Sequence, residues 1–290
     1  MNINWYPGHM KKTRESIEKN LSMVDVVFEL IDARIPYSSQ NPVIDSIVKD
    51  KPRIIILNKA DLSSIKGNKI WQEYFKKKGL NTILFNSLDR RGIEELIHMS
   101  RNITAEKTIS YEKKGIINRS IRAMIIGIPN VGKSTLINNL TGRRGAKVGN
   151  KPGITKSNQW IKTKGDLELL DTPGILWPKF EEKRVGLNLA FTGAIKDEIL
   201  DRETLALKLI ETLVEICPEL LEKRYNFEIG DSSPLEIMTD IGFKRGCIMR
   251  GGEVDYEKIS NILLDEFRKG VIGNITLEFP RENTDGHIGV

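Results

Sequence analysis

The sequence has little cysteine and no hydrophobic run long enough to cross a membrane. Its two cysteines, Cys217 and Cys247, lack the paired spacing of zinc sites, and we expect both to be buried thiols of a protein in a reducing cytosol. Met1–Arg14 is polar and basic, unlike a secretory signal peptide. No run approaches about 20 apolar residues, and no lipidation motif is present. We therefore expect a cytoplasmic protein that does not bind membranes.

Length and charge suggest two domains of opposite character. The chain has 290 residues and a net charge of +6, and 39% of its residues are hydrophobic, enough for a substantial core. Residues 1–180 carry 31 Lys and Arg against 17 Asp and Glu, whereas residues 181–290 carry 14 against 22. Much of the basic excess lies in residues 106–164. It indicates either a polyanionic partner such as RNA or a solvated basic face, and charge alone does not decide between them.

Gly127–Ser134 (GIPNVGKS) matches the phosphate-binding loop, in which two glycines four residues apart precede a lysine and a hydroxyl residue. An apolar strand-like run, 121–126, comes before it and a segment of helical spacing, 135–140, comes after it. Backbone N–H groups and the helix dipole would then point at the phosphates. Lys133 is expected to reach the β- and γ-phosphates, and the Ser134 hydroxyl to ligate Mg²⁺. The loop residues predicted to bind GTP are Asn130, Val131, Gly132, Lys133, Ser134 and Thr135.

Asn58-Lys59-Ala60-Asp61 follows the strand-like run 53–57 and predicts specificity for guanine. The Asp61 carboxylate can accept hydrogen bonds from guanine N1–H and N2–H₂, a donor pair that adenine lacks. Lys59 is expected to lie along the base plane, and Asn58 to connect this loop to the phosphate loop. After the next apolar run, Asn86, Ser87 and Leu88 are placed to offer backbone N–H groups to the guanine carbonyl.

Asp171-Thr172-Pro173-Gly174 ends a further strand and matches the DxxG motif of GTPases. Asp171 would hold the Mg²⁺ shell, directly or through water, and the Gly174 N–H would contact the γ-phosphate. Thr155, in a polar loop between the phosphate loop and this strand, is the candidate second hydroxyl on Mg²⁺. Such a loop is ordered by GTP and released on hydrolysis.

The order of the motifs indicates a circular permutation. Ordinary small GTPases begin with the phosphate loop, whereas here 58–61 and 86–88 precede it. A doubly wound sheet tolerates this order because its ligand loops all lie at the carboxyl ends of the strands, and domain termini are often close enough to be rejoined. The predicted fold is α/β: a circularly permuted P-loop GTPase with a doubly wound, mostly parallel sheet and a smaller all-α C-terminal domain.

The predicted domains are an arm (1–20), the GTPase domain (21–178), a helical domain (179–280) and a tail expected to be poorly ordered (281–290). Apolar spacing predicts helices over 11–17, 41–49, 69–78 and 92–101, and then over 181–191, 201–216, 234–241 and 255–267. The first strand is expected over 23–31. Residues 106–118 are interpreted as the join that the permutation introduces. Residues 157–164 are expected to form a hairpin with the DxxG strand.

These motifs resemble the ribosome biogenesis GTPase A (YlqF/RbgA) family, bacterial circularly permuted GTPases that mature the large ribosomal subunit. The resemblance covers nearly the whole chain. Besides the GTPase motifs it rests on three further segments: WYPGHM (5–10), DARIP (32–36) and RGGEVD (250–255). The first of these is far more specific than any single GTPase motif. Within DARIP, the sequence also allows Asp32 and Arg34 simply to pair and fix a turn.

The resemblance also bears on catalysis. Many GTPases place a glutamine after the DxxG glycine to orient the attacking water, but here Ile175 occupies that position and cannot do so. The resemblance points to His9 as the catalytic residue brought toward the γ-phosphate, with Lys133 and Gly174. A histidine in a flexible arm could equally be a partner contact.

Two further roles follow from related GTPases. In relatives with a hydrophobic residue at the glutamine position, an asparagine at the place of Asn130 helps to bind K⁺; the simpler alternative is that Asn130 caps the loop. The resemblance implies an RNA-binding helical module at the C-terminus. The short basic loops at 242–246 and 250–252 would then contact rRNA phosphates, or would only be turns between helices.

The expected function is a Mg²⁺-dependent GTPase that binds a late precursor of the large (50S) ribosomal subunit and dissociates after hydrolysis. It is expected to contact rRNA and ribosomal proteins and to be a monomer off the ribosome. One alternative is an RNA-binding assembly chaperone in which GTP is mainly structural. The other alternative is a GTPase that acts on membranes or tRNA. The sequence shows no membrane helix or second group of catalytic residues that would support it.

Overall fold

The computed structural model describes residues 8–48, 51–86, 92–142, 159–163, 166–172, 182–195 and 201–280, with the backbone alone at 8–13, 16, 159 and 171. Several predicted features lie outside the described residues: the start of the arm, the whole tail, Ser87, Leu88, Thr155 and Gly174. For His9 and Asp171 the backbone is described and the side chain is not.

Six strands form one sheet in the order β3-β2-β1-β4-β6-β5. All neighbouring pairs are parallel except β5 with β6, which is antiparallel. The strands are β1 (Val26–Asp32), β2 (Arg53–Asn58), β3 (Asn81–Phe85), β4 (Ile121–Gly127), β5 (Gln159–Lys162) and β6 (Leu167–Asp171). The predicted doubly wound, mostly parallel sheet is confirmed, as is the hairpin with the DxxG strand. β1 is buried along its whole length, as expected where helices cover both faces.

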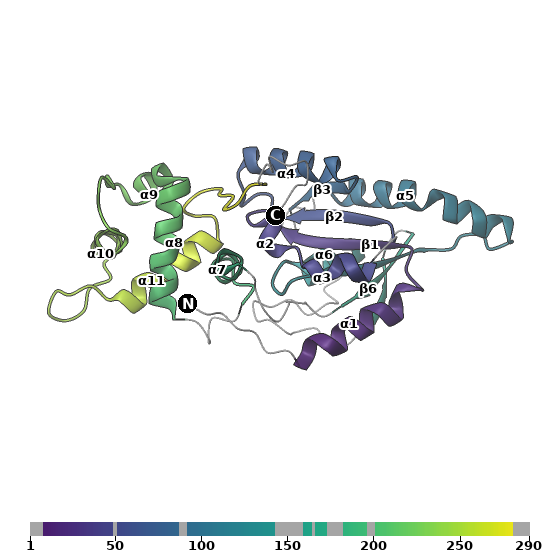
Figure 1. The fold of residues 1–290 in the computed structure, drawn as a ribbon, viewed down its shortest axis with the longest axis horizontal. Coiled ribbons are helices and arrows are strands. Elements are labelled where there is room, and N and C mark those ends of the chain that lie inside the picture. Colours follow the sequence, from purple (N-terminus) through teal and green to yellow (C-terminus); the bar gives the residue numbers. More distant parts are fainter. Residues whose placement is uncertain are drawn as a thin grey trace.

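Helices cover both faces of this sheet (Figure 1). Ile17, Ile44 and Phe75 bring α1, α3 and α4 onto one face, where they meet alternate residues of the central strands. Leu96 and Leu136 bring α5 and α6 onto the other. The bounds are α1 (Gly8–Leu21), α2 (Pro36–Ser39), α3 (Pro42–Val48), α4 (Ile65–Lys77), α5 (Ile93–Lys113) and α6 (Lys133–Thr141).

Beyond the sheet, the described chain is helical and forms a second lobe beside it (Figure 1). This helical region contains α7 (Lys183–Phe191), α8 (Arg202–Ile216), α9 (Pro218–Tyr225), α10 (Pro234–Lys244) and α11 (Tyr256–Arg268). Cys217 and Cys247 are buried free thiols in it, as predicted. None of the helices in the described ranges is long and apolar enough to cross a membrane.

The structure differs from the sequence predictions at three places in the helices. The helix predicted over 92–101 is longer, because α5 continues to Lys113 and includes the first part of the charged segment 106–118 that is interpreted as the join. α10 continues to Lys244, so the predicted basic loop at 242–246 begins only at Arg245. α9, which Pro218 begins directly after α8, is a helix that the apolar spacing did not predict.

The last part of the described chain returns from the helical region to the GTPase domain. We call residues 269–280 the return segment. Its backbone N–H groups at Ile275 and Leu277 donate to the carbonyls of Leu62 and Arg34, at 2.9 and 2.8 Å. The segment contains no helix and contacts α2 and α4, so the two lobes are joined by α7 and again by the return segment (Figure 1).

Candidate nucleotide-binding site

The phosphate-loop and guanine-loop motifs lie where β1, β2, β3, β4 and β6 all end on the same side of the sheet. The strands run parallel, so their carboxyl ends form one edge, the position where doubly wound folds bind ligands. The permuted chain order does not change this edge, because the edge depends on which strands are neighbours in the sheet and not on their order in the chain.

The phosphate loop joins β4 to α6 with the backbone that its glycines allow. Gly127 and Gly132 have φ of 153° and 106°, in the region that favours glycine. A Cβ at Gly127 would come within 2.5 Å of the Leu30 carbonyl oxygen, so β1 leaves no space for a side chain there. Lys133 is buried, and its Nζ donates to the carbonyls of Gly127 and Ile128 at 2.9 and 2.8 Å. These bonds hold its ammonium inside the loop.

The first turn of α6 contains the remaining phosphate-loop residues. Gly132 is the N-cap, and the N–H groups of a helix's first turn have no acceptor within the helix. Ser134 and Thr135 are half-buried in this turn. The turn therefore combines the helix dipole with the Lys133 charge, an arrangement suited to an anion such as a nucleotide phosphate.

The guanine loop is fixed to two other strand ends. Asn58 is buried, and its Nδ2 donates to the Val131 carbonyl at 2.6 Å, the connection to the phosphate loop expected for it. The Ala60 N–H donates to the carbonyl of Phe85, at the end of β3, next to Asn86. Asp61 is half-buried at the end of this loop. The loop thus has a defined position relative to both the phosphate loop and β3.

Lys59 forms an ion pair that the sequence analysis did not predict. Its φ is 58°, and its Nζ lies 2.9 Å from Oδ2 of Asp32 at the end of β1. The same carboxylate pairs with Arg34, whose Nε and Nη2 lie 2.9 and 2.7 Å from its two oxygens. Burial alone would raise the pKa of Asp32, but Arg34 and then Lys59 outweigh it and hold that pKa well below its usual range. Burial lowers the pKa of Lys59, and Asp32 offsets only part of that effect.

The DxxG strand is aligned with the phosphate-loop strand. Asp171 is opposite Ile125 in the β4–β6 ladder, and the Thr172 hydroxyl donates to the Ile125 carbonyl at 2.5 Å. Within the described ranges no three His, Cys, Asp or Glu residues could together hold a metal ion. A nucleotide-linked Mg²⁺ does not need such a cluster, because one or two protein oxygens and the phosphates suffice. The half-buried Ser134, in the first turn of α6, offers a hydroxyl oxygen of the kind that Mg²⁺ binds.

The phosphate loop also contacts the helical region directly. The Asn130 Nδ2 donates to the carbonyl of Gly193, just after α7, at 2.7 Å. Asn130 has φ of 58°, so its side chain projects from a left-handed turn of the loop. This contact differs from both roles predicted for Asn130, a K⁺ ligand and a local cap.

Sequence reasoning missed two residues that join the two lobes, although it named Arg34 and Asn130, which also contact the helical region. The first is the buried Glu278, in the return segment, which accepts from Ser38 and from Asn188 of α7. Arg268, at the end of α11, is another. No periodic pattern or known motif marks either position, and only the fold brings their partners close.

Comparison with known proteins decides the family. The chain is 48% identical over 280 residues to the ribosome biogenesis GTPase A of Bacillus pumilus, covering 97% of this chain and 99% of the relative. This chain belongs to the ribosome biogenesis GTPase A family. The family member from Thermotoga maritima is 32% identical, with 97% of this chain and 96% of the relative covered.

Two other comparisons agree with this assignment. The family model described as "50S ribosome-binding GTPase" matches residues 122–226. The GDP-bound structure of Thermotoga maritima YlqF has a TM-score of 0.67 and 28% identity, covering 92% of this chain and all of that one. A GNP-bound structure of the same protein has a TM-score of 0.62.

The family and the site agree on the activity. As a member of this family, the chain binds guanine nucleotides, hydrolyses GTP and has a role in ribosome biogenesis. The phosphate loop, the guanine loop and the DxxG strand meet at one edge of the sheet, as that activity requires.

Proposed function

We propose that the GTP-bound protein binds a late precursor of the large (50S) ribosomal subunit, hydrolyses GTP on the particle and then dissociates. The observation that carries this proposal is the 48% identity to a ribosome biogenesis GTPase A, which extends over 97% of the chain and so includes the helical region. A chain that shared only nucleotide chemistry would be similar only around the GTPase motifs. Ribosome maturation also implies a cytoplasmic location.

Hydrolysis would depend on positioning and charge. Water attacks the γ-phosphorus, the bond to the β–γ bridging oxygen breaks, and GDP and phosphate leave. Lys133 and the first-turn N–H groups of α6 would neutralise charge on the phosphates, and the Gly174 N–H would bind the γ-phosphate. Ser134, Thr155 and Asp171 would hold Mg²⁺, which would neutralise further charge when bound.

Orientation of the attacking water needs a residue from elsewhere, because Ile175 follows Gly174. We assign this role to His9, at the start of α1, brought toward the γ-phosphate on the precursor particle. Asn130 would bind K⁺ through its amide oxygen, while the Nδ2 bond to Gly193 sets the orientation of that amide. The free enzyme should then turn over slowly and the particle should accelerate it.

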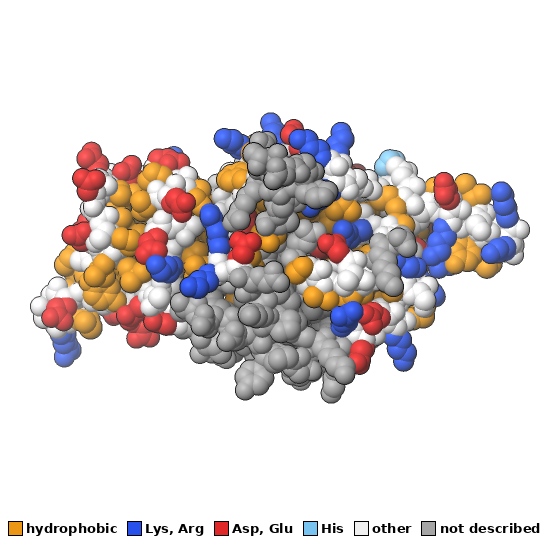
Figure 2. Space-filling view, in the orientation of Figure 1, with side chains coloured by type: hydrophobic (Ala, Val, Ile, Leu, Met, Phe, Trp, Pro, Cys, Tyr) orange, Lys and Arg blue, Asp and Glu red, His pale blue; other side chains and the backbone are white. Residues whose placement is uncertain are grey.

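The described surface offers positive charge to an RNA partner. The solvent-facing side of α4 carries the exposed lysines Lys66, Lys69, Lys76 and Lys77, with Lys78 at the helix end. Glu73 is the one exposed acidic residue among them. Figure 2 shows Lys and Arg gathered over α4, whereas acidic side chains dominate the visible face of the helical region. An RNA-rich particle would therefore meet the α4 side in preference to the outer helices.

The test measures GTP hydrolysis with and without purified large subunits, in K⁺ and in Na⁺, for the wild type and His9→Ala. Strong stimulation that His9→Ala abolishes, with particle binding preserved, supports the proposal. Equal stimulation of both proteins makes His9 a contact residue only. No stimulation in either salt would break the connection to large-subunit assembly.

A second variant separates this proposal from an assembly chaperone that uses GTP structurally. Lys133→Ala should abolish hydrolysis and release from the particle, because the loop loses the Lys133 ammonium (about 2–3 kcal/mol of phosphate binding). If subunit maturation continues normally with this variant, and the variant is folded, hydrolysis is incidental and the chaperone function holds instead.

A further inference from the structure

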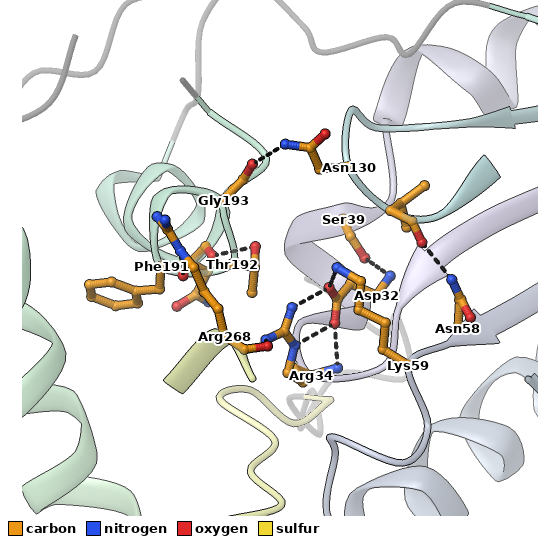
Figure 3. A network of polar contacts seen from close by, with 12 residues as sticks. Asp32, Arg34, Ser39, Asn58, Lys59, Asn130, Phe191, Thr192, Gly193 and Arg268 are labelled. Carbon is orange, nitrogen blue, oxygen red and sulfur yellow. Dashed lines mark hydrogen bonds and ion pairs between the residues drawn. The ribbon is translucent and has the colours of Figure 1, made fainter. Parts of the chain in front are cut away.

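Hydrogen bonds and ion pairs, linked by short stretches of backbone, form a closed circuit that leaves the nucleotide site, passes through the helical region and returns (Figure 3). It starts at Lys59 of the guanine loop and ends at Asn58, the neighbouring residue. The circuit matters because guanine-loop and phosphate-loop residues are both members of it.

Asp32 is the first junction of the circuit. Its carboxylate is 2% exposed and accepts from Lys59 Nζ, from Arg34 Nε and Nη2, and from the Arg34 backbone N–H at 3.1 Å. The Ser39 hydroxyl holds the Asp32 backbone by accepting its N–H at 2.9 Å. A carboxylate held by this many groups has one position, so the lysine that pairs with it also has a restricted position.

Arg34 carries the circuit into the helical region. Its side chain is buried, and the nitrogen not engaged with Asp32, Nη1, donates to the Arg268 carbonyl at the end of α11, at 3.3 Å. The guanidinium also lies 5.5 Å from the centre of the Phe267 ring. A planar guanidinium can satisfy the carboxylate and the helix end together, which a lysine ammonium cannot do from one position.

Arg268 turns the circuit back toward the phosphates. Its Nε and Nη2 both donate, at 2.9 Å, to the carbonyls of Phe191 and Ala190 in the last turn of α7. Gly193, directly after that turn, accepts from Asn130 of the phosphate loop. The loop's Val131 carbonyl then accepts from Asn58, which closes the circuit.

From this geometry we infer that Asp32 is a positioning residue for Lys59 in guanine-nucleotide binding, and that Arg34 and Arg268 couple this position to the docking of α7 and α11. The inference goes beyond the proposed ribosomal role and needs only the GTPase activity. Coupling between two sites is reciprocal. Contacts at the end of α11 should therefore affect nucleotide affinity, and the nucleotide should stabilise the ends of α7 and α11.

The first experiment measures GDP affinity and the single-turnover rate at saturating GTP for Asp32→Asn, Lys59→Met and the double variant, without ribosomes. Asp32→Asn should weaken GDP binding about tenfold, within the usual range of coupling, and leave the saturated rate near that of the wild type. Weaker GDP binding with an unchanged saturated rate would show that the substitution removes binding of the nucleotide and not stabilisation of the transition state. The double variant should bind no more weakly than Lys59→Met, because Asp32 acts through Lys59.

The second experiment tests the distant part of the circuit. Arg268→Ala should weaken GDP binding about fivefold. Lys269→Ala is the matched control: this neighbouring side chain is exposed and pairs with Asp265 of the preceding helical turn, so binding should not change. Hydrogen exchange with and without GDP should show added protection at the ends of α7 and α11 in the wild type, and less in Arg268→Ala.

Two results would overturn the inference. Additive losses in the double variant would show that Asp32 does not act through Lys59. Wild-type GDP affinity in Arg268→Ala, with unchanged exchange protection, would show that the helical region is docked without coupling. If Asp32→Asn does not fold, the comparison of Arg268→Ala with Lys269→Ala decides alone. Because ribosomes are absent, neither result bears on the large-subunit proposal.

Discussion

Glu278 accepts hydrogen bonds from both the backbone N–H and the hydroxyl of Ser38, at 2.6 and 2.5 Å, across 240 residues of sequence. Asn188 of α7 donates to the same carboxylate at 2.8 Å, and the Trp71 indole N–H donates to the Glu278 carbonyl at 3.0 Å. One residue of the return segment therefore joins α2, α4 and α7. Burial raises the pKa of Glu278, although the bonds from Ser38 and Asn188 offset part of that shift.

We expect Glu278→Ala to lower the free energy of unfolding by about 3 kcal/mol, because Ser38 and Asn188 then lose a buried charged acceptor. Chemical denaturation measures the change. Glu257→Ala, at an exposed acidic position of α11, is the control and should change stability by less than about 0.5 kcal/mol. Equal effects of the two substitutions would show that the return segment contributes nothing to docking.

Gly67→Ala should destabilise the protein, although alanine normally favours a helix interior over glycine by about 1 kcal/mol. A Cβ at Gly67 in α4 would collide with the Thr276 side chain of the return segment and with the Ser64 hydroxyl, which caps α4. The substitution should lower the melting temperature and make the return segment accessible to protease.

Removing the obstructing side chain should restore part of the loss. In Gly67→Ala combined with Thr276→Gly, the Cβ gains space and the melting temperature should rise above that of Gly67→Ala alone. A melting temperature in Gly67→Ala equal to or above that of the wild type would contradict the close packing of α4 against the return segment.

Glu29 in β1 makes stability depend on pH. It is buried, and its Oε1 has no hydrogen-bond partner among the described residues. Burial raises the pKa of Glu29 to about 7, Asp45 adds to the rise, and Arg53 opposes it. Between about pH 4.5 and 7 the folded chain retains a proton that the unfolded chain has released, so stability falls as pH rises through this window.

Glu29→Gln should remove this dependence. Relative to the wild type, the variant should gain up to about 3 kcal/mol between pH 5 and pH 8, because glutamine carries no charge to bury. Melting temperatures of both proteins at the two pH values test this. A difference between the proteins that stays the same at pH 5 and pH 8 would show that Glu29 does not titrate in this window.

The lysines of α4 should act in binding to the large subunit and not in nucleotide binding. Glutamine at Lys66, Lys69, Lys76 and Lys77 should weaken particle binding and reduce its dependence on salt, by up to about 0.7–0.9 in log–log slope for each phosphate that is no longer neutralised. GDP affinity should remain unchanged. Glutamine at Lys223 and Lys258, exposed in the acidic helical region, is the control. An unchanged salt slope for the α4 variant would remove α4 from the RNA-facing surface.

The amino-acid sequence by itself determined the fold class and the location of the GTPase motifs. Phosphate binding needs Gly127, Gly132 and Lys133 within one short segment, and guanine recognition needs Asn58 to Asp61 in another. The spacing of nearby residues in the sequence is therefore enough to identify both motifs. The order of these segments was enough to indicate the permutation. Apolar periodicity also located most of the helices, since burial of one face depends on neighbouring residues.

Only the tertiary structure decided how the two lobes are joined. Glu278 and Ser38, Arg268 and Phe191, and Asn130 and Gly193 are pairs separated by long stretches of sequence. Their partners are largely backbone carbonyls and N–H groups, which every residue has, so no residue type signals the contact. The position of such groups follows from the packing of whole helices against the sheet, and that packing exists only in the folded chain.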